Sequence, residues 1–239
     1  MRINRELCIG CGDCLLYCPV DAILMKEETA IIDTALCLDC GACIRAGCPV
    51  NAIENTLEEN RAQSIAKDFS DPMRYHETKI PGRGTEEVKT NDVTGVVKKG
   101  EVGVLIEMGR PCLGSSMKDI ETITKSLSPL GIMYEPNNPL IRLMEDPGKG
   151  TFPADLLGMK IVSAIIQFSI PLKNLKTVLE TLMKCQEKIE TVFSLSVISR
   201  LHSNMQIPKE LVAGLSEMGL TYRPNAKINL GLGRPLAKD

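Results

Sequence analysis

The chain has 239 residues, ten cysteines, no tryptophan and a formal net charge of −2. This length accommodates a small module plus one ordinary domain. An aromatic content of 3% argues against a surface that stacks nucleic-acid bases. No apolar run reaches the roughly 18–20 residues that a membrane-spanning helix needs. We therefore expect no nucleic-acid partner and no membrane span.

The charge is unevenly distributed along the chain. Residues 1–55 carry four basic and eight acidic side chains, a balance of −4, while the remaining 24 basic and 22 acidic side chains leave the rest at +2. An acidic N-terminal end suits a redox partner protein with a basic docking surface, because opposite potentials steer association. Small solvated domains are often mildly acidic as well, so both interpretations remain open.

Eight of the ten cysteines form two runs: Cys8, Cys11, Cys14 and Cys18, then Cys37, Cys40, Cys43 and Cys48. Each run spaces three thiols three residues apart and ends with a fourth cysteine before a proline. Three closely spaced thiolates suit three irons of a cubane, whose fourth iron needs a more distant cysteine. Zinc gives no reason for a third cysteine at this interval, and the Cys-Pro endings without a signal peptide disfavour disulfides. The spacing predicts two 4Fe–4S clusters.

The two runs also form an internal repeat, in which CIGCGDC from Cys8 aligns with CLDCGAC from Cys37 at an offset of 29 residues. On these motifs, residues 1–55 resemble the bacterial two-4Fe–4S (dicluster) ferredoxin family. The resemblance implies a pseudo-two-fold module in which each half lends its last cysteine to the other half's cluster. It assigns one cluster to Cys8, Cys11, Cys14 and Cys48, and the other to Cys37, Cys40, Cys43 and Cys18.

The second run departs from the family pattern by one residue. Residues 44–47 separate Cys43 from Cys48, where the usual run has three residues. We expect the extra residue to reshape the loop that carries Cys48 without removing a ligand. Small residues in the ligand loops let backbone N–H groups approach the cluster sulfurs; these are Gly10, Gly12, Gly41 and Ala42.

After short strands at Ile23–Lys26 and 30–33, the composition changes. Residues 56–100 are expected to be a linker or docking segment with a polar helix at 58–67. Arg83 lies in a glycine-rich stretch whose backbone N–H groups could bind an anion, although a solvated connector is the alternative.

Residues 101–239 alternate strand and helix patterns and predict a third region. Ser116 and Asp119 form a capping box that opens a helix, and Pro208 is placed to begin another. The expected elements are strands at 102–107, 132–135, 160–170 and 191–199, a helix from Ser116 that stops near Pro129 and Gly131, a helix at 171–189, and a last strand at 220–232. The sequence therefore predicts an α+β protein in which the dicluster module precedes a ferredoxin-like (βαββαβ) α+β sandwich domain.

Outside the cysteine runs, two Gly-Arg-Pro tripeptides place Arg110 and Arg234 in stiff loops. Such arginines suit bidentate binding of a carboxylate or phosphate, so with Arg83 they are candidates for a small anionic ligand or substrate. Ordinary turns with exposed guanidinium groups are the alternative. Cys112, near a helix N-terminus, is either reactive or buried, and Cys185 is expected in the core.

Together these features predict a cytoplasmic iron–sulfur protein, in a reducing and oxygen-poor cell, that passes single electrons to or from a partner oxidoreductase. Residues 83–95 with the Gly-Arg-Pro loop resemble iron–sulfur regions of anaerobic ring reductases such as 6-hydroxynicotinate reductase, but no catalytic residue carries over. Two alternatives remain: an electron-input component of an anaerobic reductase that binds an anionic substrate, and a redox- or ligand-sensing regulator. An electron carrier or reductase subunit is favoured over a stand-alone enzyme.

Overall fold

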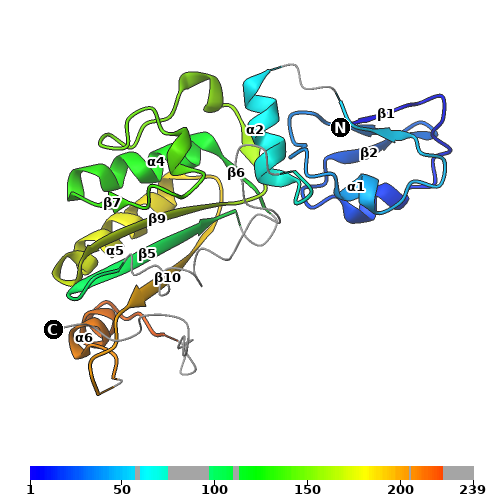
Figure 1. Cartoon of the computed structure of the whole chain (residues 1–239). Helices are drawn as coiled ribbons and strands as arrows, with labels where there is room; N and C mark the ends of the chain where they lie inside the picture. The colour runs from blue at the N-terminus through cyan, green and yellow to red at the C-terminus, as the bar shows by residue number, and fades with distance from the viewer. Residues whose placement is uncertain (57–59, 75–96, 110–112, 205, 223–239) are drawn as a thin grey trace.

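A computed structural model describes residues 1–56, 60–74, 97–109, 113–204 and 206–222. Figure 1 shows the cysteine-rich module at one end, a larger region with a four-stranded sheet at the other, and helix α2 (Arg61–Ser70) between them. The protein is therefore a mixed α+β structure. No helix in these ranges is long and apolar enough to cross a membrane.

The cysteine-rich module contains two small antiparallel sheets. They pair β1 (Arg2–Ile3) with β4 (Ile53–Glu54), and β2 (Ile23–Lys26) with β3 (Thr29–Ile32). The expected strands are thus confirmed, the second one residue early. Each cysteine run carries one short helical segment, a 3₁₀ turn at Asp13–Tyr17 in the first and α1 (Ala42–Arg45) in the second.

The larger region contains a four-stranded antiparallel sheet with the order β10-β5-β9-β7. Its strands are β5 (Glu101–Met108), β7 (Met133–Tyr134), β9 (Ala164–Pro171) and β10 (Phe193–Ser199). Two helices link them, α4 (Met117–Leu127) after β5 and α5 (Leu175–Cys185) after β9. A small sheet of β6 (Ser115–Ser116) with β8 (Lys160–Ile161) and the helix α6 (Lys209–Glu217) complete the described elements.

The main core lies between this sheet and the helices. Every second residue of β5 faces it, as the period of two in a strand requires; these are Val102, Val104, Ile106 and Met108. Helix α4 contributes Ile120 and Ile123, and α5 contributes Val178 and Leu182, at the helical spacing of three to four residues. These buried apolar residues hold the sheet and the two helices together.

Helix α2 joins the same core. It begins at Arg61 because the Asn60 side chain accepts a hydrogen bond from Gln63 N at 3.0 Å. Ile65 and Phe69 are buried against the larger region. The polar helix expected at 58–67 is therefore displaced by three residues, and one of its faces is apolar and packed.

Three further expectations need correction. The strand expected at 160–170 is two strands, β8 and β9, in different sheets. The chain turns between them, where Val162 N donates to Ser70 Oγ at 3.1 Å. The helix expected at 171–189 is α5 flanked by 3₁₀ turns at Leu172–Asn174 and Gln186–Lys188. Residues 220–222 form no strand, and 223–232 lie outside the described residues.

The N-cap half of the predicted capping box at the start of α4 is confirmed and gives a stability prediction. Ser116 Oγ accepts from Asp119 N at 3.0 Å and donates to Asp119 Oδ2 at 2.8 Å. Ser116→Ala should lower the free energy of unfolding by about 1 kcal/mol. Ser126→Ala is the control, because that hydroxyl donates within the helix to Thr122 O and its loss should change stability by under about 0.5 kcal/mol. Urea unfolding followed by circular dichroism measures both, and equal losses would contradict a capping role.

Candidate iron–sulfur site

The structure sorts the eight cysteines of the two runs into two groups. One pocket, with about 430 Å³ of empty space, is lined by thiols of Cys8, Cys11, Cys14 and Cys48, and Cys43 reaches its wall. The other, with about 330 Å³, is lined by Cys18, Cys37, Cys40 and Cys43. Each pocket therefore combines three cysteines of one run with the last cysteine of the other.

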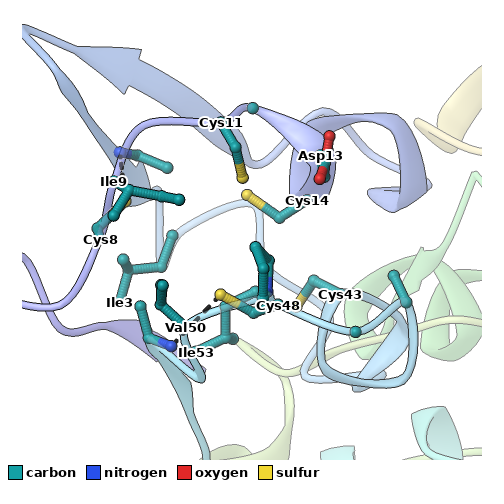
Figure 2. Close-up of a pocket in the computed structure, with 16 residues that line it drawn as sticks. Ile3, Cys8, Ile9, Cys11, Asp13, Cys14, Cys43, Cys48, Val50 and Ile53 are labelled. Carbon is teal, nitrogen blue, oxygen red and sulfur yellow. Dashed lines mark hydrogen bonds between the residues drawn. The ribbon is translucent and has the colours of Figure 1, made fainter.

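Figure 2 shows the first of these pockets. The Cys11 and Cys14 thiols point toward one another, and the Cys48 thiol lies across the pocket from them. Ile3, Val50 and Ile53 form an apolar wall beside them. The pocket is a set of soft sulfur donors within apolar surroundings, which is the environment of an iron–sulfur cluster.

Backbone hydrogen bonds explain why the last cysteine of each run lies with the other run. Asn4 N donates to Ala52 O at 2.8 Å, and the equivalent Asp33 N donates to Ala22 O at 2.8 Å. The carbonyls of Asn4 and Asp33 in turn accept from Cys8 N at 3.1 Å and Cys37 N at 3.0 Å. The start of each run is thus fixed beside the segment that follows the last cysteine of the other.

Backbone N–H groups also reach several of the sulfurs. Ala22 N lies 3.1 Å from Cys18 Sγ, and Ala52 N lies 3.3 Å from Cys48 Sγ. Ala30 N donates to Cys8 Sγ at 3.5 Å, and Asp39 N donates to Cys37 Sγ at 3.4 Å. Such donors stabilise thiolates, and in a cluster they tune the reduction potential.

The thiols also affect one another electrostatically. Burial, with smaller contributions from the nearby Cys40 and Cys37 thiolates, raises the pKa of Cys43 to about 11. Burial likewise raises the pKa of Cys14, with smaller contributions from Cys11, Cys8 and Cys48. Grouped anionic sulfurs need a positive charge among them, which iron supplies. The donor set and its surroundings therefore fit 4Fe–4S clusters.

Comparison with known proteins agrees with this geometry. Residues 7–52 match the family model described as a 4Fe-4S dicluster domain. A protein named Ferredoxin 7Fe from Hydrogenibacillus schlegelii is 52% identical over 70 residues, which are 28% of this chain and 88% of that protein. A ferredoxin from Alicyclobacillus acidocaldarius is 45% identical over 65 residues, 26% of this chain and 82% of that protein.

The chain belongs to the 4Fe–4S dicluster ferredoxin family. Its membership rests on the N-terminal module, which carries ferredoxin-type iron–sulfur electron transfer. The same module is 51% identical over 47 residues to a component of an ion-translocating oxidoreductase complex from Methanosarcina acetivorans, 20% of this chain but only 17% of that protein. No solved structure gave a significant match.

The pseudo-two-fold repeat of this ferredoxin module extends to unusual backbone conformations. Equivalent residues with positive φ occur in both halves: Gly10 with Asp39, Gly12 with Gly41, and Asp21 with Asn51. Their offset is 29 residues before the last cysteine of each run and 30 after it, so the extra residue lies between Cys43 and Cys48. Gly47, with φ of 89°, occupies this stretch. Because Ala52 N reaches Cys48 as Ala22 N reaches Cys18, the insertion leaves that sulfur's donor in place.

The candidate residues outside the module have a different outcome. Arg83, Arg110, Arg234 and Cys112 all lie outside the described residues, so their anion-binding and thiol roles stay predictions. Cys185 is 2% exposed within the main core, which confirms the prediction for that residue.

Sequence reasoning missed a cavity on the sheet. About 630 Å³ of empty space lies beside β5, β7 and β9, where the charged lining residues are Lys98, Glu101 and Glu135. Gln167, at 3% exposure, lines it, and its carboxamide oxygen has no hydrogen-bond partner among the described residues. A single glutamine in a strand pattern gave no signal of this, because only the pairing of β9 with β5 and β7 creates the cavity.

The ligand loops give a prediction about two neighbouring glycines. Both Gly10 and Gly12 have positive φ, which costs any other residue strain. A Cβ on Gly10 would in addition lie 2.3 Å from the Glu28 carbonyl oxygen, whereas nothing lies within 4 Å of one on Gly12. Gly10→Ala should therefore lower the free energy of unfolding by about 1–3 kcal/mol more than Gly12→Ala. Anaerobic denaturant unfolding and iron content per chain measure the difference, and equal effects would contradict the close approach.

Proposed function

We propose that the chain binds two 4Fe–4S clusters, one held by Cys8, Cys11, Cys14 and Cys48 and the other by Cys37, Cys40, Cys43 and Cys18. The observation that carries this proposal is the composition of the two pockets, each of which takes its fourth thiol from the other run. When bound, such clusters supply one-electron chemistry at low potential.

We further propose that the protein passes single electrons to or from a partner oxidoreductase with a basic docking surface. The relatives named ferredoxins and the acidic charge of residues 1–55 support this role. The chain's own contribution is to hold the thiolates, donate N–H groups to the sulfurs and set their burial. Thiolate ligands favour a reducing compartment, which supports a cytoplasmic location.

For residues 101–239 we propose a ferredoxin-like sandwich. The four strands of the main sheet and the helices α4 and α5 follow one another as β-α-β-β-α-β, and the sheet order β10-β5-β9-β7 puts the first and third of these strands at its centre. All three strand pairs are antiparallel. This arrangement is the one expected for that fold.

Ligand sensing by residues 101–239 is a second candidate function. It is supported by the cavity and by the buried carboxamide oxygen of Gln167. Because Glu101 and Glu135 outnumber Lys98 among its charged lining residues, the cavity gives no support to an anionic substrate. The reductase alternative depends instead on Arg83, Arg110 and Arg234. A ligand-dependent shift in cluster potential would favour sensing, and turnover that is lost in Arg110→Ala would favour the reductase.

The crossed ligand sets predict which cluster each end cysteine supports. Cys18→Ala should disrupt the cluster of Cys37, Cys40 and Cys43 and spare the other, while Cys48→Ala should do the reverse. Iron content should then fall from about eight to about four ions per chain in either variant, because each cubane holds four irons. Anaerobic iron and sulfide analysis with EPR of the dithionite-reduced protein measures this.

Cys185→Ala is the matched control, because this buried cysteine lies in the main core and away from both pockets. It should leave the iron content unchanged. An unchanged EPR spectrum in Cys18→Ala would refute the crossed assignment. About seven irons in the unaltered protein, the number in the name of the relative from Hydrogenibacillus schlegelii, would refute two complete cubanes.

A further inference from the structure

The two halves of the module have similar backbones but different surroundings. Ile9 and Leu38 occupy equivalent positions, each directly after the first cysteine of its run. Ile9 is 63% exposed, whereas Leu38 is only 4% exposed. Since the local conformation repeats, the difference must come from what lies against each half.

Leu38 is covered by the larger region. A Cβ atom placed on Gly114 would lie 3.1 and 3.2 Å from the two methyl carbons of Leu38. The same Cβ atom would lie 3.2 Å from the Ile161 carbonyl oxygen. Gly114 adjoins β6 and Ile161 ends β8, so Leu38 packs where these two strands pair. The loop between Cys37 and Cys40 therefore packs against the larger region.

A polar clamp holds the same loop from a second direction. Arg45 Nη1 lies 2.8 Å from Asp71 Oδ1, and Arg45 Nη2 donates to Cys40 O at 2.7 Å. Asp71 is the residue that caps the C-terminal end of α2, whose apolar face is buried in the main core. The position equivalent to Arg45 in the first half is Leu16, which is 85% exposed.

The Cys8 pocket has exposed residues in its lining. Ile9, Cys11 and Asp13 line it and are all exposed. The exposed Glu28 lies near the loop of Ile9 and Cys11, since its backbone carbonyl oxygen lies against the Cβ position of Gly10. We call the surface of Ile9, Cys11, Asp13 and Glu28 the open end. It combines an apolar contact with carboxylates beside anionic sulfurs.

We propose that the basic redox partner protein docks on the open end, so that electrons enter or leave the chain through the cluster of Cys8, Cys11, Cys14 and Cys48. This inference rests on the proposed function. The Cys37 pocket is covered on one side by the chain's own second domain, and the open end has the negative charge that a basic partner would recognise. In each transfer the cluster at the open end loses or gains one electron and the partner's redox centre gains or loses the same electron, without a proton.

The test uses the full-length holoprotein in its oxidised state with ferric cytochrome c, a basic one-electron acceptor protein, as the probe. With both proteins oxidised no electron moves, so calorimetry or NMR titration at low ionic strength reports docking alone. Asp13→Asn should weaken binding about threefold, the size of one exposed ion pair, and added salt should remove the difference. Ile9→Ala should also weaken it, because the apolar contact is lost.

Asp21→Asn is the matched charge control. Asp21 is exposed and follows Val20, which lines the Cys37 pocket, and asparagine tolerates the same positive φ of 50°. It should leave the affinity within error, as should Met183→Ala, which removes a comparably exposed apolar side chain from α5. If Asp21→Asn weakens binding as much as Asp13→Asn does, or if neither Asp13→Asn nor Ile9→Ala has an effect, the open end is not the docking surface.

Iron analysis and EPR of the same samples separate the two proposals. If the holoprotein holds two cubanes but changes at the open end leave the affinity for cytochrome c unchanged, only the docking inference fails. If the protein assembles no pair of cubanes, the proposed function fails before any docking is measured.

Discussion

The rest of the module depends on backbone pairing of its two halves, which brings the last cysteine of each run beside the other run. Asn4 and Asp33 each donate to the segment that follows the opposite run's last cysteine, at 2.8 Å in both cases, and each accepts from the first cysteine of its own run. Because both pockets depend on this exchange, neither half is a complete binding site alone.

Desolvation and repulsion among the thiolates oppose this grouping. Burial and the Cys40 and Cys37 thiolates together raise the pKa of Cys43 to about 11. The N–H donors from Ala22 and Ala52 offset part of the cost at Cys18 and Cys48. The grouping of the cysteines therefore combines an electrostatic cost with backbone donors that reduce it.

Features that depend on residues close together in the sequence could be predicted, and features that depend on contacts between distant residues could not. The 4Fe–4S dicluster motif and the helix start at Ser116 are local in sequence, and both were predicted correctly. The break between β8 and β9 depends on a hydrogen bond from Val162 to Ser70, 92 residues away, and the pattern of apolar residues gave no sign of it. The Gln167 cavity and the burial of Leu38 likewise arise only when distant elements meet.

The extra residue between Cys43 and Cys48 lies in the same turn as Arg45, which contacts Asp71 at the end of α2. The first run crosses from Cys14 to Cys18 in a 3₁₀ turn, whereas the second has α1 and then Gly47, whose φ of 89° returns the chain to Cys48. An α-turn needs more residues than a 3₁₀ turn, and the insertion supplies one. Arg45 on that turn reaches both Asp71 and the Cys40 carbonyl. Since Ala52 N reaches Cys48 Sγ as Ala22 N reaches Cys18 Sγ, the insertion changes the path of the chain between Cys43 and Cys48 and leaves the sulfur donor in place.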